Sequence, residues 1–179
     1  MSAHAYLRVA TRSAHDQVDA LLSGYDLADR DDYIRFLGAQ AAAFLPVEQA
    51  LDQADAASLI PDWAERQRSG QLLDDLAELG IDPPAGVQAP SFSTPAEVLG
   101  GVYVLEGSRL GGSMLARSIG PGLPRNFLDG GSMRGGWKSL LALLEQNLPS
   151  IVERERAGKS AIMAFDCFSR AASVSVDSR

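Results

Sequence analysis

The strongest structural signal in the sequence is a helix start at residues 94–97. Thr94 supplies an N-cap side chain, Pro95 occupies the first helical position, and Glu97 completes a capping box. The segment that follows is largely apolar and is expected to stay helical to about Ile119, where glycine and proline at 120–122 stop it. A helix of this length and polarity must bury its surface against neighbouring elements, so it is expected to lie in the core.

Further helix signals recur along the chain, whereas strand signals are weak because β-branched residues seldom alternate with polar ones. The pattern predicts helices over Ala3–Leu22, from the N-cap Asp29 through Leu51 with a kink at Pro46, near Pro61–Arg68 and Gln71–Leu79, over Gly136–Asn147, and from Ser150 to about Ala172. Residues 80–93 contain three prolines and are expected to form a loop. The sequence therefore predicts an all-α bundle of six or seven helices.

The chain has 179 residues, which fits one domain spanning residues 1–179, with a polar tail that frays from about residue 173. Its net charge of −7 argues against nucleic acid and against anionic membranes as partners. Its one cysteine, Cys167, excludes an internal disulfide and a cysteine-rich metal site. Neither a leader nor an apolar stretch of membrane-spanning length is visible, so we expect a cytoplasmic protein.

His15 is a candidate metal ligand in the first predicted helix. It falls at the edge of that helix's apolar stripe, with Arg12 one turn and Arg8 two turns before it and Asp19 nearby. An imidazole at a core boundary can bind a metal, and two adjacent cations can hold carboxylates of the same ligand. The same spacing is also typical of an ordinary amphipathic surface, so both interpretations stay open. His4 lies near an end that we expect to fray, and we assign it no role.

Glycines thin the helix that begins at Thr94. Gly100, Gly107 and Gly111 fall within about 40° of one another on a helical wheel, so they form a strip without side chains. Because interior glycine weakens a helix by about 1 kcal/mol relative to alanine, the strip needs a reason. It could admit a flat ligand or simply permit close helix packing. We expect a structural role for the adjacent Glu106.

Two segments together resemble the heme oxygenase family. Leu7–His15 is similar to the family's proximal helix, which carries Leu, a basic residue, Ala-Thr, a second basic residue and the iron-binding His in that order. Tyr103–Gly112 is similar to the distal helix, and its Glu-Gly-Ser-x-Leu-Gly-Gly form is similar to the bacterial branch, which includes members that supply bilin to phytochromes. The resemblance implies a helical fold that holds heme between the first helix and the glycine-rich helix.

The resemblance also assigns roles to single residues. His15 would be the proximal iron ligand, Arg8 and Arg12 would pair with the heme propionates, and Gly107 and Gly111 would lie over the distal face.

Three further positions follow from the same resemblance. Ser108 stands where many animal members carry an aspartate that organises distal water; it can still bind water but supplies no carboxylate. Phe165 and Phe168 would wall the pocket, although core packing is the commoner use of phenylalanine.

The implied activity is the opening of heme to biliverdin with release of CO and iron, with heme as both substrate and cofactor. It requires O2 and external electrons, from a ferredoxin or a reductase, and a phytochrome could receive the biliverdin. Two alternatives stay open: a non-catalytic heme-binding or heme-carrying protein of the same fold, and a structural helical module. A di-iron carboxylate enzyme is excluded because neither histidine follows a glutamate by three residues.

Overall fold

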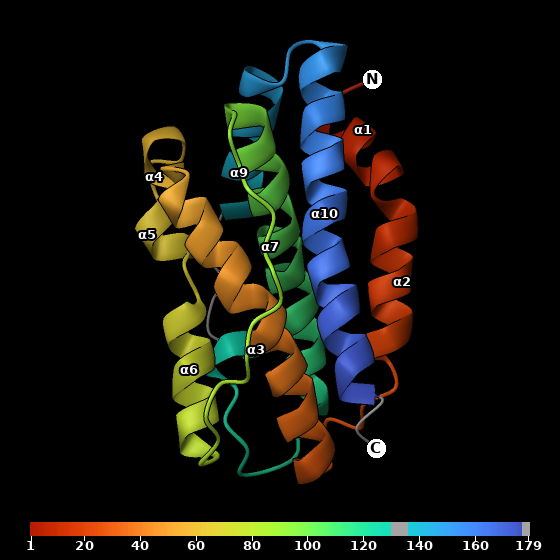
Figure 1. The fold of residues 1–179 in the computed structure, drawn as a ribbon, viewed down its shortest axis with the longest axis vertical. Coiled ribbons are helices and arrows are strands. Elements are labelled where there is room, and N and C mark those ends of the chain that lie inside the picture. The colour runs from red at the N-terminus through yellow and green to blue at the C-terminus, as the bar shows by residue number, and fades with distance from the viewer. Residues whose placement is uncertain (130–135, 177–179) are drawn as a thin grey trace.

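The structure is a computed structural model that describes residues 1–129 and 136–176. Within these ranges it contains ten α-helices, one short 3-10 turn and no strand, which confirms the predicted all-α fold class (Figure 1). The helices are α1 (Ala3–Ala10), α2 (Arg12–Leu22), α3 (Arg30–Gln53), α4 (Ala56–Leu59), α5 (Trp63–Arg66), α6 (Ser69–Glu78), α7 (Pro95–Leu115), α8 (Asn126–Asp129), α9 (Gly136–Asn147) and α10 (Ile151–Val176), with the 3-10 turn η1 at Ala116–Ser118.

The first predicted helix is divided in two at Thr11. The Thr11 hydroxyl donates a hydrogen bond of 2.8 Å to the carbonyl of Leu7, which already accepts the Thr11 backbone N–H at 2.9 Å. Threonine that bonds back to the preceding turn in this way tends to bend a helix. The prediction of one continuous helix over residues 3–22 was therefore wrong at this position.

The α3 helix begins at its predicted N-cap and passes through a proline. The Asp29 carboxylate accepts the backbone N–H groups of Asp31 and Asp32. Pro46 has no N–H, so the carbonyl of Ala42 four residues earlier lacks its helical partner. The N–H of Val87, in the loop over residues 80–93, donates to that carbonyl at 2.8 Å. The loop thus satisfies a backbone group that the proline leaves open.

The other predicted boundaries are largely confirmed. The capping box of Thr94 and Glu97 is present, and α7 ends at Leu115 before η1 completes the segment. The last helix runs to Val176, beyond its predicted end near Ala172, and residues 177–179 lie outside the described residues.

Two one-turn helices, α4 and α8, were not predicted. The buried Asp75 of α6 accepts the backbone N–H groups of Asn126 and Phe127 at 3.1 and 2.9 Å, and so fixes the start of α8. Asp75 lies about fifty positions before α8 in the chain, so the local sequence does not predict where α8 begins.

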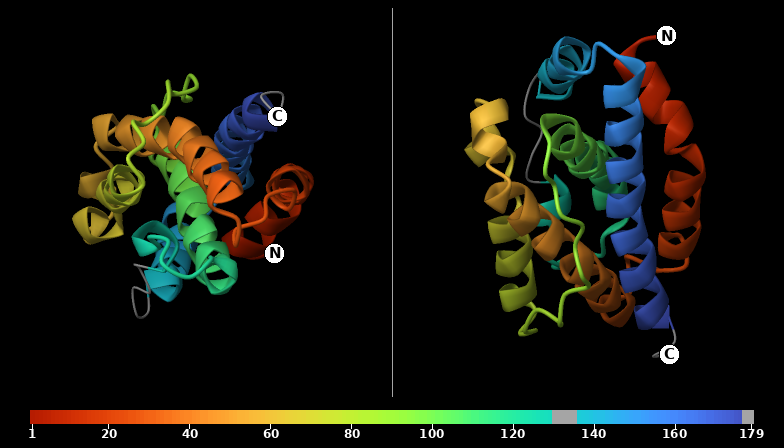
Figure 2. Two further views of the ribbon diagram at one scale, coloured as in Figure 1. Left: turned by 90° about the horizontal axis from the view of Figure 1, so that it is seen from below. Right: turned by 45° about the horizontal axis from the view of Figure 1, so that its top comes forward.

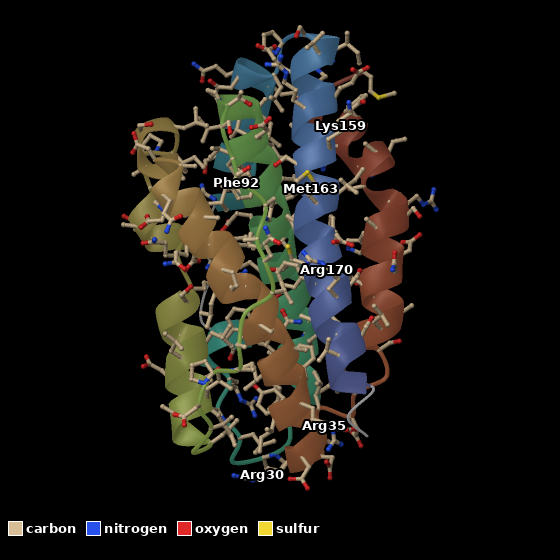
Figure 3. All side chains as sticks on the ribbon, viewed as in Figure 1. Arg30, Arg35, Phe92, Lys159, Met163 and Arg170 are labelled. Carbon is tan, nitrogen blue, oxygen red and sulfur yellow. The ribbon has the colours of Figure 1, made fainter. Side chains whose placement is uncertain are left out.

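The long helices pack around α7. In the view from below in Figure 2, α7 (green) lies centrally among α3 (orange), α10 (blue) and the α1–α2 pair (red). The helix α10 packs against α7, α3, α2 and α1. Phe92, labelled in Figure 3, ends the long loop and packs on Gly101 of α7, where an added Cβ would meet its ring at 2.7 Å. None of the helices in the described ranges combines the length and apolar character that crossing a bilayer requires.

Candidate functional site

A cavity of about 470 Å³ lies between the α1–α2 pair and α7. Small-molecule sites commonly measure roughly 300–1,000 Å³. The cavity wall includes all the residues that the sequence placed in the site: Arg8, Arg12, His15, Gly107, Ser108, Gly111, Phe165 and Phe168. His15 and the glycines of α7 therefore border the same cavity.

His15 presents an oriented imidazole to this cavity. Its Nδ1 lies 3.2 Å from Oδ2 of Asp19, one helical turn later, and 3.9 Å from Oδ1 of Asp16. Its ring meets Phe165 edge to face, with centroids 5.8 Å apart. The contact with Asp19 engages Nδ1, so Nε2 is the ring nitrogen that could bind a metal. More than half of the His15 side chain (56%) is exposed, so the ring remains accessible to a ligand.

Arg8 and Arg12 are exposed on the same wall. Within the described part of the chain, neither guanidinium donates a hydrogen bond or forms an ion pair. An arginine that borders a cavity and has no protein partner can bind an anion in two-point geometry. The site therefore offers two cations to a ligand's carboxylates.

The glycines of α7 do not share one environment. A Cβ added at Gly107 or Gly111 would meet nothing within 4 Å, so these two residues leave open space along the cavity wall. A Cβ at Gly100 would lie 2.2 Å from the carbonyl oxygen of Ala157 in α10. Of the two uses that the sequence left open for this strip, Gly100 thus serves close helix packing, while Gly107 and Gly111 border the cavity.

Ser108 lies at the cavity wall, but its hydroxyl is engaged inside the protein. Its Oγ donates to the carbonyl of Leu105 at 2.7 Å and accepts from Nη2 of Arg68 at 2.7 Å. The guanidinium of Arg68 is held between the rings of Phe44 and Phe127, at 4.8 and 4.9 Å from their centroids. Burial, and then the nearby positive charge of Arg109, lower the pKa of Arg68 to about 9. Arg68 thus ties α7 to the rest of the core just behind the cavity.

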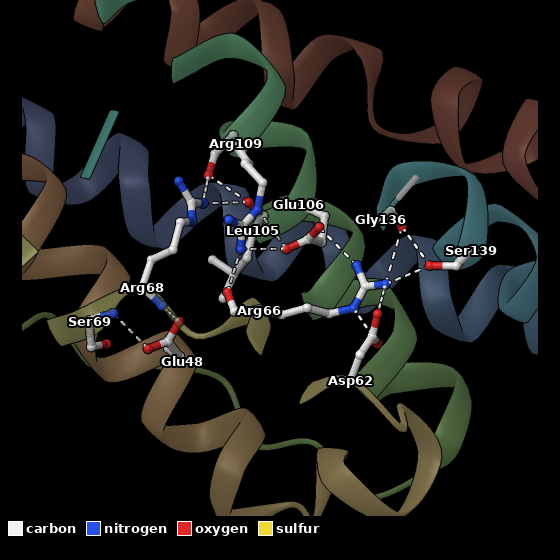
Figure 4. Close-up of polar contacts among 11 residues, drawn as sticks. Glu48, Asp62, Arg66, Arg68, Ser69, Leu105, Glu106, Arg109, Gly136 and Ser139 are labelled. Carbon is white, nitrogen blue, oxygen red and sulfur yellow. Dashed lines mark hydrogen bonds and ion pairs between the residues drawn. The ribbon is translucent and has the colours of Figure 1, made fainter. Parts of the chain in front are cut away.

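A second buried network supports the same stretch of α7 (Figure 4). Glu106 accepts from Nη1 of Arg66 at 2.9 Å and from Nε of Arg109 at 3.2 Å. Arg66 also donates to both oxygens of Asp62, at 2.7 and 2.8 Å, and to Ser139 at 2.8 Å. Glu106 is therefore a buried structural acid, as the sequence indicated.

Two phenylalanines of α10 close another side of the cavity. Phe165 and Phe168 are both buried, and both line the cavity as well as belonging to the core. The two uses that the sequence left open therefore coincide.

The lining residues that the sequence did not assign to the site include three aromatic or imidazole side chains: His4, Tyr103 and Trp137. Burial raises the pKa of Tyr103, and its hydrogen bond with the Thr11 side chain and the charge of Arg8 oppose this rise. The expectation that the N-terminus frays at His4 was wrong, because the Ser2 side chain caps α1. A signal was present: His4 precedes Arg8 by four residues, so both fall on one helix face.

Comparison with known proteins identifies relatives of this chain. No protein-family model matches the chain. The heme oxygenase PigA of Pseudomonas aeruginosa is 32% identical over 173 residues, which cover 90% of this chain and 87% of that protein. The chain belongs to the heme oxygenase family. A second family member, a heme oxygenase of Xanthomonas campestris pv. campestris, is 33% identical over 144 residues, or 76% of this chain and 87% of that protein.

The fold of this family member also matches a solved structure. The NO- and CO-bound heme oxygenase of Neisseria meningitidis aligns with a TM-score of 0.82 over 99% of this chain and 93% of that one, at 20% sequence identity. The two proteins share a fold. The resemblance read from residues 7–15 and 103–112 thus extends over the whole chain.

Proposed function

We propose that this protein is a heme oxygenase, which opens heme to biliverdin and releases CO and iron. One observation carries the proposal: in a chain of this family, His15 and the two open glycines of α7 border the same cavity. An imidazole on one wall and two glycines with open space beside them on the other suit a flat macrocycle with a metal at its centre.

The proposed proximal ligand is His15. Since Nδ1 contacts Asp19, Nε2 would bind the iron, and the carboxylate would hold the ring in one tautomer and raise its basicity. Bound heme supplies the chemistry of O2 reduction, and the protein sets its orientation and surroundings. Phe165, edge to face with His15, would limit rotation of the ring.

On the same wall, Arg8 and Arg12 would bind the heme carboxylates. Both are exposed and have no partner among the described residues, so binding them to an anion breaks no existing contact. Their position one and two turns before His15 would fix how heme is rotated about the iron–histidine bond. That rotation would decide which meso carbon of the ring is opened.

The distal wall would act through the backbone of α7. Gly107 and Gly111 permit close approach of the ligand, because no side chain intervenes. Ser108 donates its proton to Leu105, so its oxygen keeps only an acceptor site for an ordered water. We therefore infer that Ser108 helps to place water and does not deliver a proton directly.

Electrons and O2 would come from outside the chain, with a ferredoxin or a reductase as donor. We propose biliverdin as the product and a phytochrome as one acceptor for it.

The deciding experiment is titration with heme followed by product analysis with a chemical reductant. Wild-type protein is expected to give a Soret band and to yield biliverdin and CO. The His15→Ala variant is expected to lose the native spectrum and turnover, and added imidazole should restore part of both. A stable heme complex that survives O2 and reductant unchanged would identify a heme carrier and contradict the proposal. Wild-type turnover in His15→Ala would contradict only the assignment of His15 as the iron ligand.

A further inference from the structure

The first turn of α1 is held firmly in place. Both oxygens of the Glu145 carboxylate accept backbone N–H groups, from Ala3 at 3.0 Å and His4 at 3.2 Å. The bond from Ala3 is the main reason that the pKa of Glu145 is lowered. The Ser2 side chain accepts the N–H of Ala5 at 3.1 Å. His4 therefore occupies a fixed position on the cavity wall, even though it is the fourth residue of the chain.

The imidazole of His4 lies against aromatic rings and has no polar partner. Its centroid lies 5.8 Å from that of Trp137 in an edge-to-face contact and 6.2 Å from that of Tyr103. No hydrogen bond or ion pair of its ring nitrogens occurs within the described residues. Glu145 is close, but its oxygens bind the backbone. Imidazole carries at least one N–H donor in either protonation state, so His4 brings an unused donor to the cavity.

The charges around the cavity differ between its two ends. The lining acids are Asp16 and Asp19, both on α2, and Asp19 contacts His15. Next to His4, the lining ionisable groups are Arg8 and the phenol of Tyr103, and Tyr103 is hydrogen-bonded to Thr11. The α1 end therefore combines two free donors with no lining carboxylate, and so it favours an anionic group.

We propose that His4 is a binding and specificity-determining residue, which together with Arg8 holds one carboxylate of heme at the α1 end of the cavity. The inference rests on the proposed function, since heme is the ligand that brings the carboxylates. Because α1 is anchored through Glu145, this contact would help to select one rotation of heme about the His15 axis.

The test compares hemin with hemin dimethyl ester, which lacks the negative charges, by quenching of tryptophan fluorescence. The measured quantity is the ratio of the two dissociation constants, for wild type, His4→Phe, His4→Gln and Tyr6→Phe. His4→Phe keeps a ring against Trp137 but removes the donor, and it is expected to reduce the preference for the diacid about tenfold. His4→Gln keeps an N–H donor and should retain most of the preference.

The control Tyr6→Phe lies on the same helix but faces Gly158 of α10, so its ratio should equal that of wild type. If His4→Phe weakens diacid and ester equally, or weakens neither, the inference is overturned while the proposed function stands. If wild-type protein binds no hemin, the proposed function fails first. Thermal unfolding of each variant shows whether it is folded.

Discussion

Two sets of arginines border the cavity region, and the fold uses them in opposite ways. Arg66, Arg68 and, on α7 itself, Arg109 are buried, and each donates hydrogen bonds to protein groups. Arg8 and Arg12, on the α1–α2 side, are exposed and bind nothing within the described chain. Each arginine carries the same charge in both sets. The first set holds the wall of the cavity together, and the second set remains available to bind a ligand.

The difference has an energetic basis. A buried arginine must be paired, because removing its partner leaves a desolvated charge that costs about 3–5 kcal/mol. An exposed arginine without a partner contributes little to folding, so its position is not explained by stability. Where such residues face a cavity, ligand binding is the simpler explanation.

The largest expected effect comes from breaking the buried set. Glu106→Ala would leave Arg66 and Arg109 without their shared carboxylate and should lower the free energy of unfolding by about 3–5 kcal/mol. Urea denaturation measures the change. Glu155→Ala removes an exposed acid of α10 and serves as the control. Equal stability of the two variants would mean that the buried network does not hold α7.

The exposed set should respond in the reverse manner. Replacing Arg8 and Arg12 with Glu should weaken heme binding about 10- to 100-fold through lost charge-assisted hydrogen bonds, with little change in unfolding. Spectroscopic heme titration gives the affinity. The pair Arg156→Glu and Lys159→Glu on exposed positions of α10 makes the same change in net charge and should leave the affinity near that of wild type. A large loss of stability in the Arg8 and Arg12 variant would erase the distinction between the two sets.

The glycines of α7 also divide into those that serve packing and those that border the cavity. Gly100→Ala must displace the Ala157 carbonyl, so it should destabilise the fold by about 1–3 kcal/mol. Gly111→Ala fills open space and should stabilise the helix by about 0.5–1 kcal/mol. Gly111→Leu should remain folded but obstruct heme binding. Unfolding curves together with heme titration separate these outcomes, and normal turnover in Gly111→Leu would place the glycine away from the ligand.

The smallest expected effect concerns the anchor of α1. The folded-state pKa of Glu145 is below its ordinary value of 4.5, so its contribution to stability is present above about pH 4.5 and is lost as the pH falls through the folded-state value. Because the carboxylate is exposed, we expect Glu145→Gln to cost about 0.5 kcal/mol or less at pH 7. The difference in unfolding free energy between wild type and variant should disappear as the pH falls through the folded-state pKa of Glu145; a constant difference would contradict this assignment.

Features with local causes were predictable from the sequence. The capping box at Thr94 and the N-cap at Asp29 involve residues at most three positions apart, and both are present as expected. The fold class and the family were likewise correct. The roles of His15, Arg8, Arg12 and the open glycines stay predictions, although these residues do surround one cavity.

Features with distant causes were not predictable. The helical wheel places Gly100 beside Gly107, but it does not say that Ala157 of another helix lies over the first. The anchor of His4 at Glu145 lies far along the chain, although the Ser2 cap and the spacing of His4 and Arg8 were visible locally. The start of α8 depends in the same way on Asp75. For Gly100 and for the start of α8, the deciding partner is supplied by tertiary packing, and the neighbouring residues do not reveal it.

The hydrogen bond between the Val87 N–H and the Ala42 carbonyl has a consequence for how the chain can vary in length. Residues 80–85 could gain or lose residues as surface loops commonly do. The portion from Gly86 onward packs in a fixed register against the middle of α3. A Cβ added at Gly86 would lie only 2.7 Å from the Pro46 side chain. An insertion there would leave the Ala42 carbonyl without its hydrogen-bond donor. The first part of the loop can therefore vary in length, whereas the second part stabilises α3 at its proline.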